Sequence, residues 1–235
     1  MFETLIIAPL SNTLIALTSL FWGNLGLAVI VLTIIVKLIL FPFSLSSIKH
    51  QAAIKKIQPL INDINTKYSD KNERALKTME LYREHKTNPF SGCLPLLVQI
   101  PIIIGLYQVF LKGAAFNPEI LYSFVQAPEF ISNVFLGIEL TGKSVLFAII
   151  AGISQYIQIS RSPAFQQVAN SSNTEKDPQV MMMESMQKMM RYILPVMITF
   201  FALVSPAAVA LYWIVTNIFT IGQEYFVYKK MLKNT

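Results

Sequence analysis

The sequence predicts an all-α integral membrane protein with five transmembrane helices, because it is rich in apolar residues and gathers them in uncharged runs. Of its 235 residues, 54% are hydrophobic and 14% are charged, and the mean hydropathy is +0.52. A water-soluble domain could not bury so much apolar surface in one core, so we expect lipid to cover much of it. The uncharged runs approach the roughly 20 residues that a helix needs to cross about 30 Å of hydrocarbon.

Four such runs are separated by polar segments, and the last run divides in two. No charged residue occurs between Arg191 and Glu224, but Ser205-Pro206 interrupts the apolar stretch. Proline, together with the restricted residue before it, disfavours one continuous helix. The predicted spans are 24–46, 89–111, 144–160, 188–205 and 206–228.

The basic residues predict the orientation, because Lys and Arg accumulate in short cytoplasmic loops. Segment 47–88 holds nine Lys and Arg residues, so we expect it to be cytoplasmic. Loop 112–143 has two lysines against three glutamates and is expected outside. With five spans, loop 161–187 and the lysine-bearing tail 229–235 are cytoplasmic and the N-terminus is outside. Four spans would leave that tail outside. We therefore interpret the net charge of +6 mainly as a determinant of membrane orientation.

Segment 1–23 is expected to form an amphipathic helix in the external membrane interface. One stripe of its helical pattern is apolar and a neighbouring stripe is polar. The apolar stripe contains Leu10, Leu14, Leu17 and Phe21, and the polar stripe contains Ser11, Asn12, Thr18 and Ser19. A sixth span is the alternative, but the polar stripe argues against it, and Gly23-Asn24 leaves almost no loop before the next span.

Segment 47–88 is predicted to form a cytoplasmic helical hairpin. Apolar residues recur at alternating spacings of three and four in its first half, as in the seam of a packed helix. They are Ile54, Ile57, Ile61, Ile64 and Tyr68. Asp70 and Glu73 have the spacing of a helix start, and Asn88-Pro89 ends the second helix. The expected facing stripe of that helix is Ala75, Met79 and Tyr82.

No enzymatic, metal or cofactor chemistry is predicted. Cys93 is the single cysteine, and the two histidines have no ligands at metal-binding spacing. The predicted spans contain no Ser/His pair or paired carboxylates, and the sequence has no Walker-type phosphate loop. The alternative to the function proposed below is a small membrane transporter or channel subunit. Prolines within apolar segments would suit the broken helices of a transporter, although the sequence shows no internal repeat.

Lys37 lies inside the first predicted span and is the main candidate for a functional group. It follows the start of the span by about 12 residues, or roughly 18 Å of helix. An ammonium facing lipid there costs about 2.5–3.5 kcal/mol, so we expect Lys37 to face protein, water or a cavity. Snorkelling towards the cytoplasmic interface is the alternative. Polar residues of the spans could line a groove with it: Thr33, Gln99, Gln155, Gln158, Trp213, Asn217 and Thr220.

Several motifs resemble the YidC/Oxa/Alb membrane protein insertase family. They occur in the family's order, from about Pro9 to Lys230, and the second one is highly specific. These motifs are Lys-Leu-Ile-Leu-Phe-Pro at 37–42 followed by Gln58-Pro59, Asn-Pro-Phe-Ser-Gly-Cys-Leu-Pro-Leu-Leu-Val-Gln-Ile-Pro at 88–101, Gln-Ala-Pro at 126–128, and Leu-Tyr-Trp-Ile-Val-Thr-Asn at 211–217.

The resemblance implies five helices around a hydrophilic groove that opens to cytoplasm and lipid and is closed outside. Lys37 matches the position of an arginine in the family's groove, so the charge is kept but the bidentate fork is lost. Thr33, Gln99, Tyr212 and Trp213 match groove or substrate-facing positions, and Gln155 is the choice from the third span.

The resemblance also implies a function and partners. We expect a membrane insertase and chaperone, working alone or with the Sec translocon, that inserts and helps fold integral membrane proteins. The expected partners are nascent membrane proteins, membrane lipids, Sec and, through the cytoplasmic hairpin, the ribosome. The expected form is a monomer in the bacterial plasma membrane, similar to short bacterial members without a large periplasmic domain.

Overall fold

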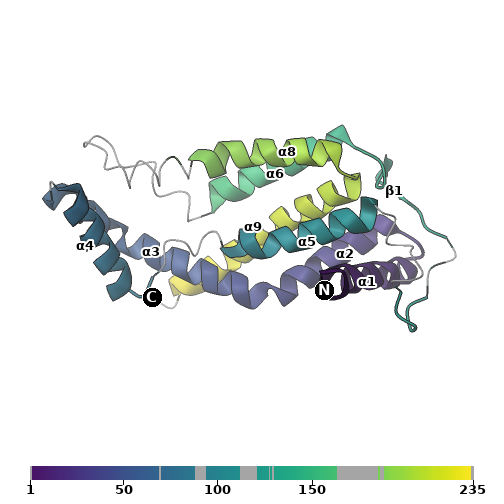
Figure 1. Cartoon of the computed structure of the whole chain (residues 1–235), viewed down its shortest axis with the longest axis horizontal. Coiled ribbons are helices and arrows are strands. Elements are labelled where there is room, and N and C mark those ends of the chain that lie inside the picture. The colour runs from purple at the N-terminus through teal and green to yellow at the C-terminus, as the bar shows by residue number, and fades with distance from the viewer. Residues whose placement is uncertain are drawn as a thin grey trace. The chain divides into compact units, whose positions relative to one another are not determined.

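The computed structural model describes residues 2–68, 70–87, 94–111, 121–126, 128, 130–162, 185 and 188–233. These residues form mostly helices, as predicted, with one small antiparallel hairpin that was not predicted (Figure 1). The elements are a π-helical turn (Glu3–Ile7), α1 (Ala8–Leu20), α2 (Leu25–Ile39), α3 (Phe41–Lys67), α4 (Lys71–Glu84), α5 (Leu94–Leu111), β1 (Val134–Phe135), β2 (Ile138–Glu139), α6 (Val145–Arg161), a second π-helical turn (Met189–Ile193), α8 (Leu194–Val204) and α9 (Ala207–Lys233).

The chain divides into two compact units, each assembled from segments that are far apart in the sequence. The first unit consists of Met1–Phe41, Leu96–Gln155 and Pro195–Thr220. The second consists of Pro42–Pro95, Tyr156–Leu194 and Ile221–Thr235. Helices α6 and α9 each contribute residues to both units.

Some sequence predictions concern residues outside this description. They include the Asn88 to Cys93 part of the most specific motif, Ala127 in the Gln126–Pro128 motif, and residues 112–120 of the expected external loop. Most of the expected cytoplasmic loop 161–187 also lies outside the described residues.

Three of the four residues in the polar stripe of α1 are buried inside the first unit, and Ser19 is exposed. Ser11, Asn12 and Thr18 are almost completely buried. The Asn12 side chain donates to the carbonyl oxygen of Ala8 at 2.8 Å and accepts from the backbone N–H of Tyr122 at 2.7 Å. The Thr18 hydroxyl donates to the carbonyl oxygen of Leu14 at 2.7 Å. Much of the polar pattern of this helix therefore reflects packing against protein, where Asn12 and Thr18 find hydrogen-bond partners. Its place in the membrane interface stays a prediction.

The first predicted span, 24–46, is interrupted in the structure. Helix α2 starts after Asn24, whose side chain accepts a hydrogen bond of 3.0 Å from the backbone N–H of Leu27. The helix ends at Ile39, and α3 begins at Phe41. Pro42 explains this break, because proline has no N–H to continue the hydrogen bonding of α2 and is best accommodated in the first turn of a helix, as at the start of α3. Helix α3 therefore begins before residue 47, the position at which the sequence analysis placed the start of the helical hairpin.

Among the described residues, few helices are long and apolar enough to cross a membrane on their own. Glu3–Leu20 meets the length and hydropathy requirement, and a second span results only if Leu25–Ile39 and Phe41–Ile54 are counted together. Leu97–Phe110, Val145–Arg161 and Met189–Val204 are apolar but shorter.

In the second unit, α3 and α4 share a small apolar core. Ile57, Ile61 and Tyr82 are buried, with Ile54 and Leu81 packed against them. Asp70 caps α4 by accepting a hydrogen bond of 3.0 Å from the backbone N–H of Glu73, as the sequence predicts. The predicted facing stripe is wrong at Met79, which is 53% exposed. Leu81, next to Tyr82, occupies the packed side of α4 instead.

The β-hairpin lies at the end of the first unit where α9 begins (Figure 1). The backbone N–H groups of Ala207 and Ala208 donate to the carbonyl oxygens of Gly142 and Leu140, at 2.7 and 2.9 Å. These bonds satisfy two of the N–H groups that a helix start leaves without intrahelical partners. Ser205-Pro206 separates α8 from α9 at the position that the sequence predicts.

Candidate functional site

The last helix, α9, carries a polar face inside the first unit. Trp213, Asn217 and Thr220 recur at spacings of four and three residues, so they lie on one side of the helix, and Tyr212 directly precedes Trp213. Hydrogen bonds connect this side to α2, α5 and α6. Within the unit, each of these helices is otherwise strongly apolar. The interhelical hydrogen bonds described below all link such a helix to α9.

Lys37 of α2 bonds to this face of α9. Its ammonium Nζ donates to Thr220 Oγ1 at 3.0 Å, and the Thr220 hydroxyl donates in turn to the carbonyl oxygen of Thr216 at 2.8 Å. The threonine is thereby oriented with a lone pair towards the ammonium. Both side chains are half-buried. Lys37 therefore contacts protein.

The Lys37–Thr220 bond joins residues at similar distances from one end of the first unit. Leu25 and Ala207, which begin α2 and α9, both donate backbone hydrogen bonds to the segment 132–142. Lys37 lies about 12 residues and Thr220 about 13 residues beyond these starts, or roughly 18 and 20 Å. The lysine side chain thus reaches across to α9 rather than along its own helix, which argues against snorkelling.

Helix α6 is clamped to α9 by two hydrogen bonds. Trp213 Nε1 donates to Gln155 Oε1 at 2.8 Å, and Asn217 Nδ2 donates to Ser154 Oγ at 2.9 Å. Gln155 and Asn217 are buried. An edge-to-face ring contact with Phe201 of α8, at 6.3 Å between centroids, also holds the Trp213 indole. The indole is consequently fixed in orientation.

Helix α5 joins the same face through Gln99, whose Nε2 donates to the hydroxyl of Tyr212. Tyr212 is fully buried, whereas Gln99 is half-buried. The structure thus brings five predicted site residues into polar contact with α9 or onto it: Lys37, Gln99, Gln155, Tyr212 and Trp213.

Thr33 is the predicted site residue that the structure places differently. It is completely buried, and its hydroxyl donates to the carbonyl oxygen of Val29 on its own helix at 2.6 Å. Ser154 was missed among the site residues, because a single serine gives no sequence signal. Asn217 and Thr220 were noticed as polar residues at helical spacing with Trp213, and that spacing is the signal that would have included them.

This arrangement offers hydrogen bonding and one positive charge in apolar surroundings. A carboxamide, a phenol, an indole and hydroxyl groups supply donors and acceptors, and Lys37 supplies the cation. Among the residues that the structure describes, no group of three or more His, Cys, Asp or Glu side chains could hold a metal ion. The site is therefore suited to holding polar groups of another molecule.

Comparison with known proteins places this chain in a family. Residues 17–234 match the family described as 60Kd inner membrane protein. The chain belongs to this family. The match covers nearly the whole sequence, and the resemblance seen in the motifs is confirmed.

Relatives of this chain include proteins named as membrane protein insertases. The membrane protein insertase YidC of Oceanobacillus iheyensis is 31% identical over 235 residues, covering 98% of this chain and 84% of the relative. Membrane protein insertase YidC 2 of Listeria innocua is 34% identical over 93% of this chain and 69% of its own length. Membrane protein insertase MisCA of Bacillus subtilis is 29% identical over 94% and 77%, respectively.

A second polar cluster lies in the second unit. Glu224 Oε1 accepts hydrogen bonds from Gln158 Nε2 at 3.4 Å and from Ser162 Oγ at 3.2 Å. Ser162 is buried, and the other two side chains are half-buried. This cluster continues the pairing of α6 with α9 and holds the carboxylate of Glu224 in place.

Proposed function

We propose that this protein inserts integral membrane proteins into the bilayer and helps them fold, by receiving polar client segments in a hydrophilic groove beside α9. The observation that carries the proposal is the bond between Lys37 and Thr220 within a bundle of apolar helices. The relatives named as membrane protein insertases support it.

The proposed topology has five spans, an external N-terminus and a cytoplasmic C-terminus. The apolar helices α5, α6 and α8 and the uncharged first part of α9 support these spans. In this topology the β-hairpin end of the first unit is external, and α1 lies in the interface. The hairpin of α3 and α4 is cytoplasmic, where its nine Lys and Arg residues belong.

The groove would lower the cost of moving polar peptide into the membrane. Each backbone group without a partner in hydrocarbon costs several kcal/mol. Side chains such as Gln99, Gln155 and Asn217 offer replacement hydrogen bonds, and Lys37 attracts acidic groups. The client's own apolar segment supplies the driving force, at about 0.3–0.6 kcal/mol for each Leu, Ile or Phe at a helix centre.

Lysine makes this site different from one built on arginine. A guanidinium holds a carboxylate through two parallel hydrogen bonds, whereas the Lys37 ammonium is a point charge with three rotatable donors. One of these donors is directed at Thr220. We therefore expect the site to accept acidic tails without strict geometric demands.

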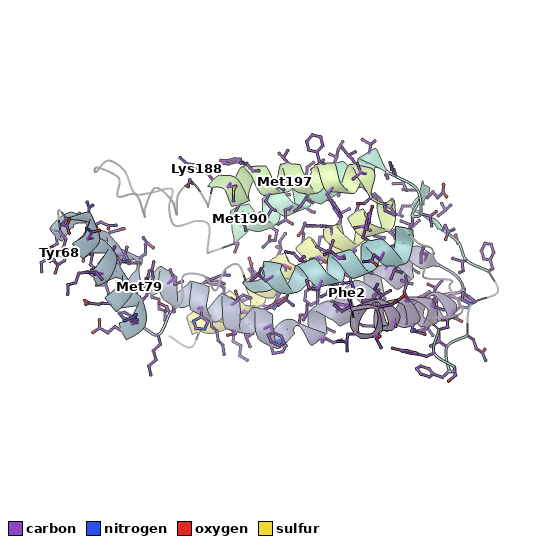
Figure 2. The ribbon with its side chains drawn as sticks, in the orientation of Figure 1. Phe2, Tyr68, Met79, Lys188, Met190 and Met197 are labelled. Carbon is purple, nitrogen blue, oxygen red and sulfur yellow. The ribbon has the colours of Figure 1, made fainter. Side chains whose placement is uncertain are left out.

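The cytoplasmic hairpin is proposed as the first contact for clients. Leu76 and Met79 of α4 are exposed apolar side chains among charged neighbours, and Figure 2 shows Met79 on this helix. Such a surface can bind an apolar segment before it enters lipid. Ribosome contact through the basic residues, cooperation with the Sec translocon and function as a monomer belong to the same proposal.

Insertion of a single-span client with a short acidic external tail tests the proposal. The protein is reconstituted in liposomes, and tail translocation is measured for the native chain, Lys37→Ala and Lys37→Arg. Loss of one charged hydrogen bond of about 1.5 kcal/mol predicts roughly tenfold slower insertion for the alanine variant and near-native insertion for the arginine variant.

The matched control is Lys56→Ala, which removes an exposed lysine from α3 and should leave insertion unchanged. A client with a neutral tail should depend less on Lys37 than the acidic one. Full activity of Lys37→Ala on the acidic client would reject the role of the charge. Solute flux through client-free liposomes would instead support the transporter alternative.

A further inference from the structure

Large apolar side chains are exposed at the end of the first unit where α2 begins. Trp22 is 89% exposed, Leu136 is 80% exposed and Phe130 is 71% exposed. They come from three separate places: the turn before α2, the loop before the β-hairpin and the tip of that hairpin. We call these three residues the apolar rim. Leu20, Phe124 and Val134 are further exposed apolar residues of the same turn and loop.

Backbone contacts hold two members of the rim together. Ser132 N–H donates to the Gly23 carbonyl at 2.8 Å, and Leu25 N–H donates to the Ser132 carbonyl at 3.3 Å. A side chain at position 23 would overlap the Phe130 carbonyl, and Gly23 has a φ of +81°. Only glycine suits this close approach. The turn that carries Trp22 is therefore fixed against the loop that carries Phe130.

The third member is held by the β-hairpin. Phe135 packs so closely on Gly26 of α2 that any Cβ at position 26 would overlap its ring. The adjacent Leu136 and Gly137 form the two-residue turn, with φ values of +52° and +77°. Docking of Phe135 on α2 thus directs the tip with Leu136 away from the bundle.

Two rim residues adopt backbone conformations that are unusual for their type. Trp22 has a φ of +49° and Leu136 a φ of +52°, in the left-handed region that glycine favours. Such a conformation costs a bulky residue about 1–2 kcal/mol. Both residues with this conformational cost also expose a large apolar side chain. Contact of these side chains with water would not offset the cost.

The surroundings of the rim indicate what covers it. Leu27 of α2 and Val145 and Leu146 of α6 are exposed apolar residues in the first turns after the rim, so the rim is continuous with helix surfaces that face lipid. The hairpin also exposes Glu139, and Lys143 follows it. Aromatic and charged side chains at one level are typical of the headgroup region rather than the hydrocarbon core.

We propose that Trp22, Phe130 and Leu136 anchor this end of the protein in the boundary between lipid headgroups and acyl chains. The rim then sets the depth of α2 in the membrane. Since Lys37 follows Leu25 by about 12 residues, it is held roughly 18 Å below the anchor, in the far half of a core about 30 Å thick. This role is independent of whether the protein inserts clients.

Tryptophan fluorescence can measure the depth of the anchor. The chain has two tryptophans, so Trp213→Phe leaves Trp22 as the single emitter. The full-length variant is reconstituted into phosphatidylcholine vesicles carrying bromine near the headgroup end or near the methyl end of the acyl chains. We expect blue-shifted emission, at least twofold stronger quenching by the shallow bromine and protection from aqueous acrylamide.

Further variants make the test independent of Trp213 and extend it to the hairpin. A fluorophore on Trp22→Cys in a Cys93→Ser background keeps Trp213 in place and should report the same shallow depth. Leu136→Trp, combined with Trp22→Phe and Trp213→Phe, should also be quenched by shallow bromine. The matched control, Leu76→Trp in the same background, replaces an exposed apolar residue of α4 and should be quenched weakly.

Water-like emission of Trp22 that is insensitive to brominated lipid would overturn the proposal. Blue-shifted emission that depends on protein density but not on bromine would also overturn it, because a second copy of the chain would then cover the rim. Equal quenching at position 76 would refute a specific anchor.

Discussion

The hydrogen bond between Trp213 and Gln155 predicts a double-mutant cycle with a characteristic pattern. Gln155→Leu removes the acceptor, so the indole N–H of Trp213 loses this hydrogen bond. Trp213→Phe removes the donor, so the carboxamide oxygen of Gln155 loses the same hydrogen bond. A buried polar group that loses its partner costs about 1–3 kcal/mol, while removing both partners together can be nearly neutral. The double variant should therefore lose much less stability than the two single losses added together.

The magnitude follows from the geometry of this contact. The bond measures 2.8 Å, Gln155 is buried, and Trp213 is half-buried between α6 and α8. Interhelical bonds within membranes average about 0.6 kcal/mol and reach about 1.7 kcal/mol. A short bond at a buried site belongs in the upper part of that range, so we expect a coupling free energy of about 1–1.5 kcal/mol.

The assay is reversible unfolding of the full-length protein in mixed detergent micelles, followed by circular dichroism. Tyr156→Phe is the matched control on α6, because Tyr156 is 40% exposed and the ring contact with Tyr192 survives the change. It should alter the free energy of unfolding by less than about 0.5 kcal/mol. Strictly additive effects of the two clamp variants would show that the bond does not contribute, and the reasoning about α9 would fail.

Other predictions concern packing of the hairpins. Gly26→Ala should force the Phe135 ring away and expose the 130–142 loop to protease, whereas Gly222→Ala, with open space around it, should be neutral. Tyr82→Ala should cost about 3 kcal/mol of hairpin stability in urea unfolding, and Met79→Ala less than about 1 kcal/mol, because only Tyr82 is buried. Burial raises the pKa of Tyr82 above 10.0, so the unfolded chain ionises first and stability falls as the pH rises through the alkaline range. Between about pH 9 and pH 11 the unfolding midpoint should therefore drop more in the native chain than in Tyr82→Phe, and equal drops would contradict this.

Helix content and the main polar residues could be predicted from the sequence because both depend on local chemistry. Uncharged apolar runs identify α5, α6 and α8, and Ser205-Pro206 identifies the break before α9. The cost of an ammonium in hydrocarbon was enough to select Lys37. Spacing along one helix selected Trp213, Asn217 and Thr220 as neighbours.

Other features depend on contacts between distant segments, so the sequence could not show them. Thr33 lies one turn before Lys37, but its hydroxyl bonds to its own helix. The polar stripe of α1 looked suited to a water interface, yet Asn12 bonds to the backbone of Tyr122. Two-residue strands carry too little periodicity to be recognised. Met79 has the right spacing for the hairpin seam, but Tyr82, which is buried, and Leu81, which is partly buried, face α3, so Met79 is exposed.

The polar face of α9 has two uses under the proposed function, and these uses conflict. The same side chains that bond α2, α5 and α6 to α9 are those proposed to meet a client. A client group that enters must replace an existing bond, such as the one between Lys37 and Thr220, so its net gain is the difference between two hydrogen bonds. Such an exchange releases little free energy and keeps binding weak. An insertase needs weak binding at this point, because the client must leave the groove for lipid.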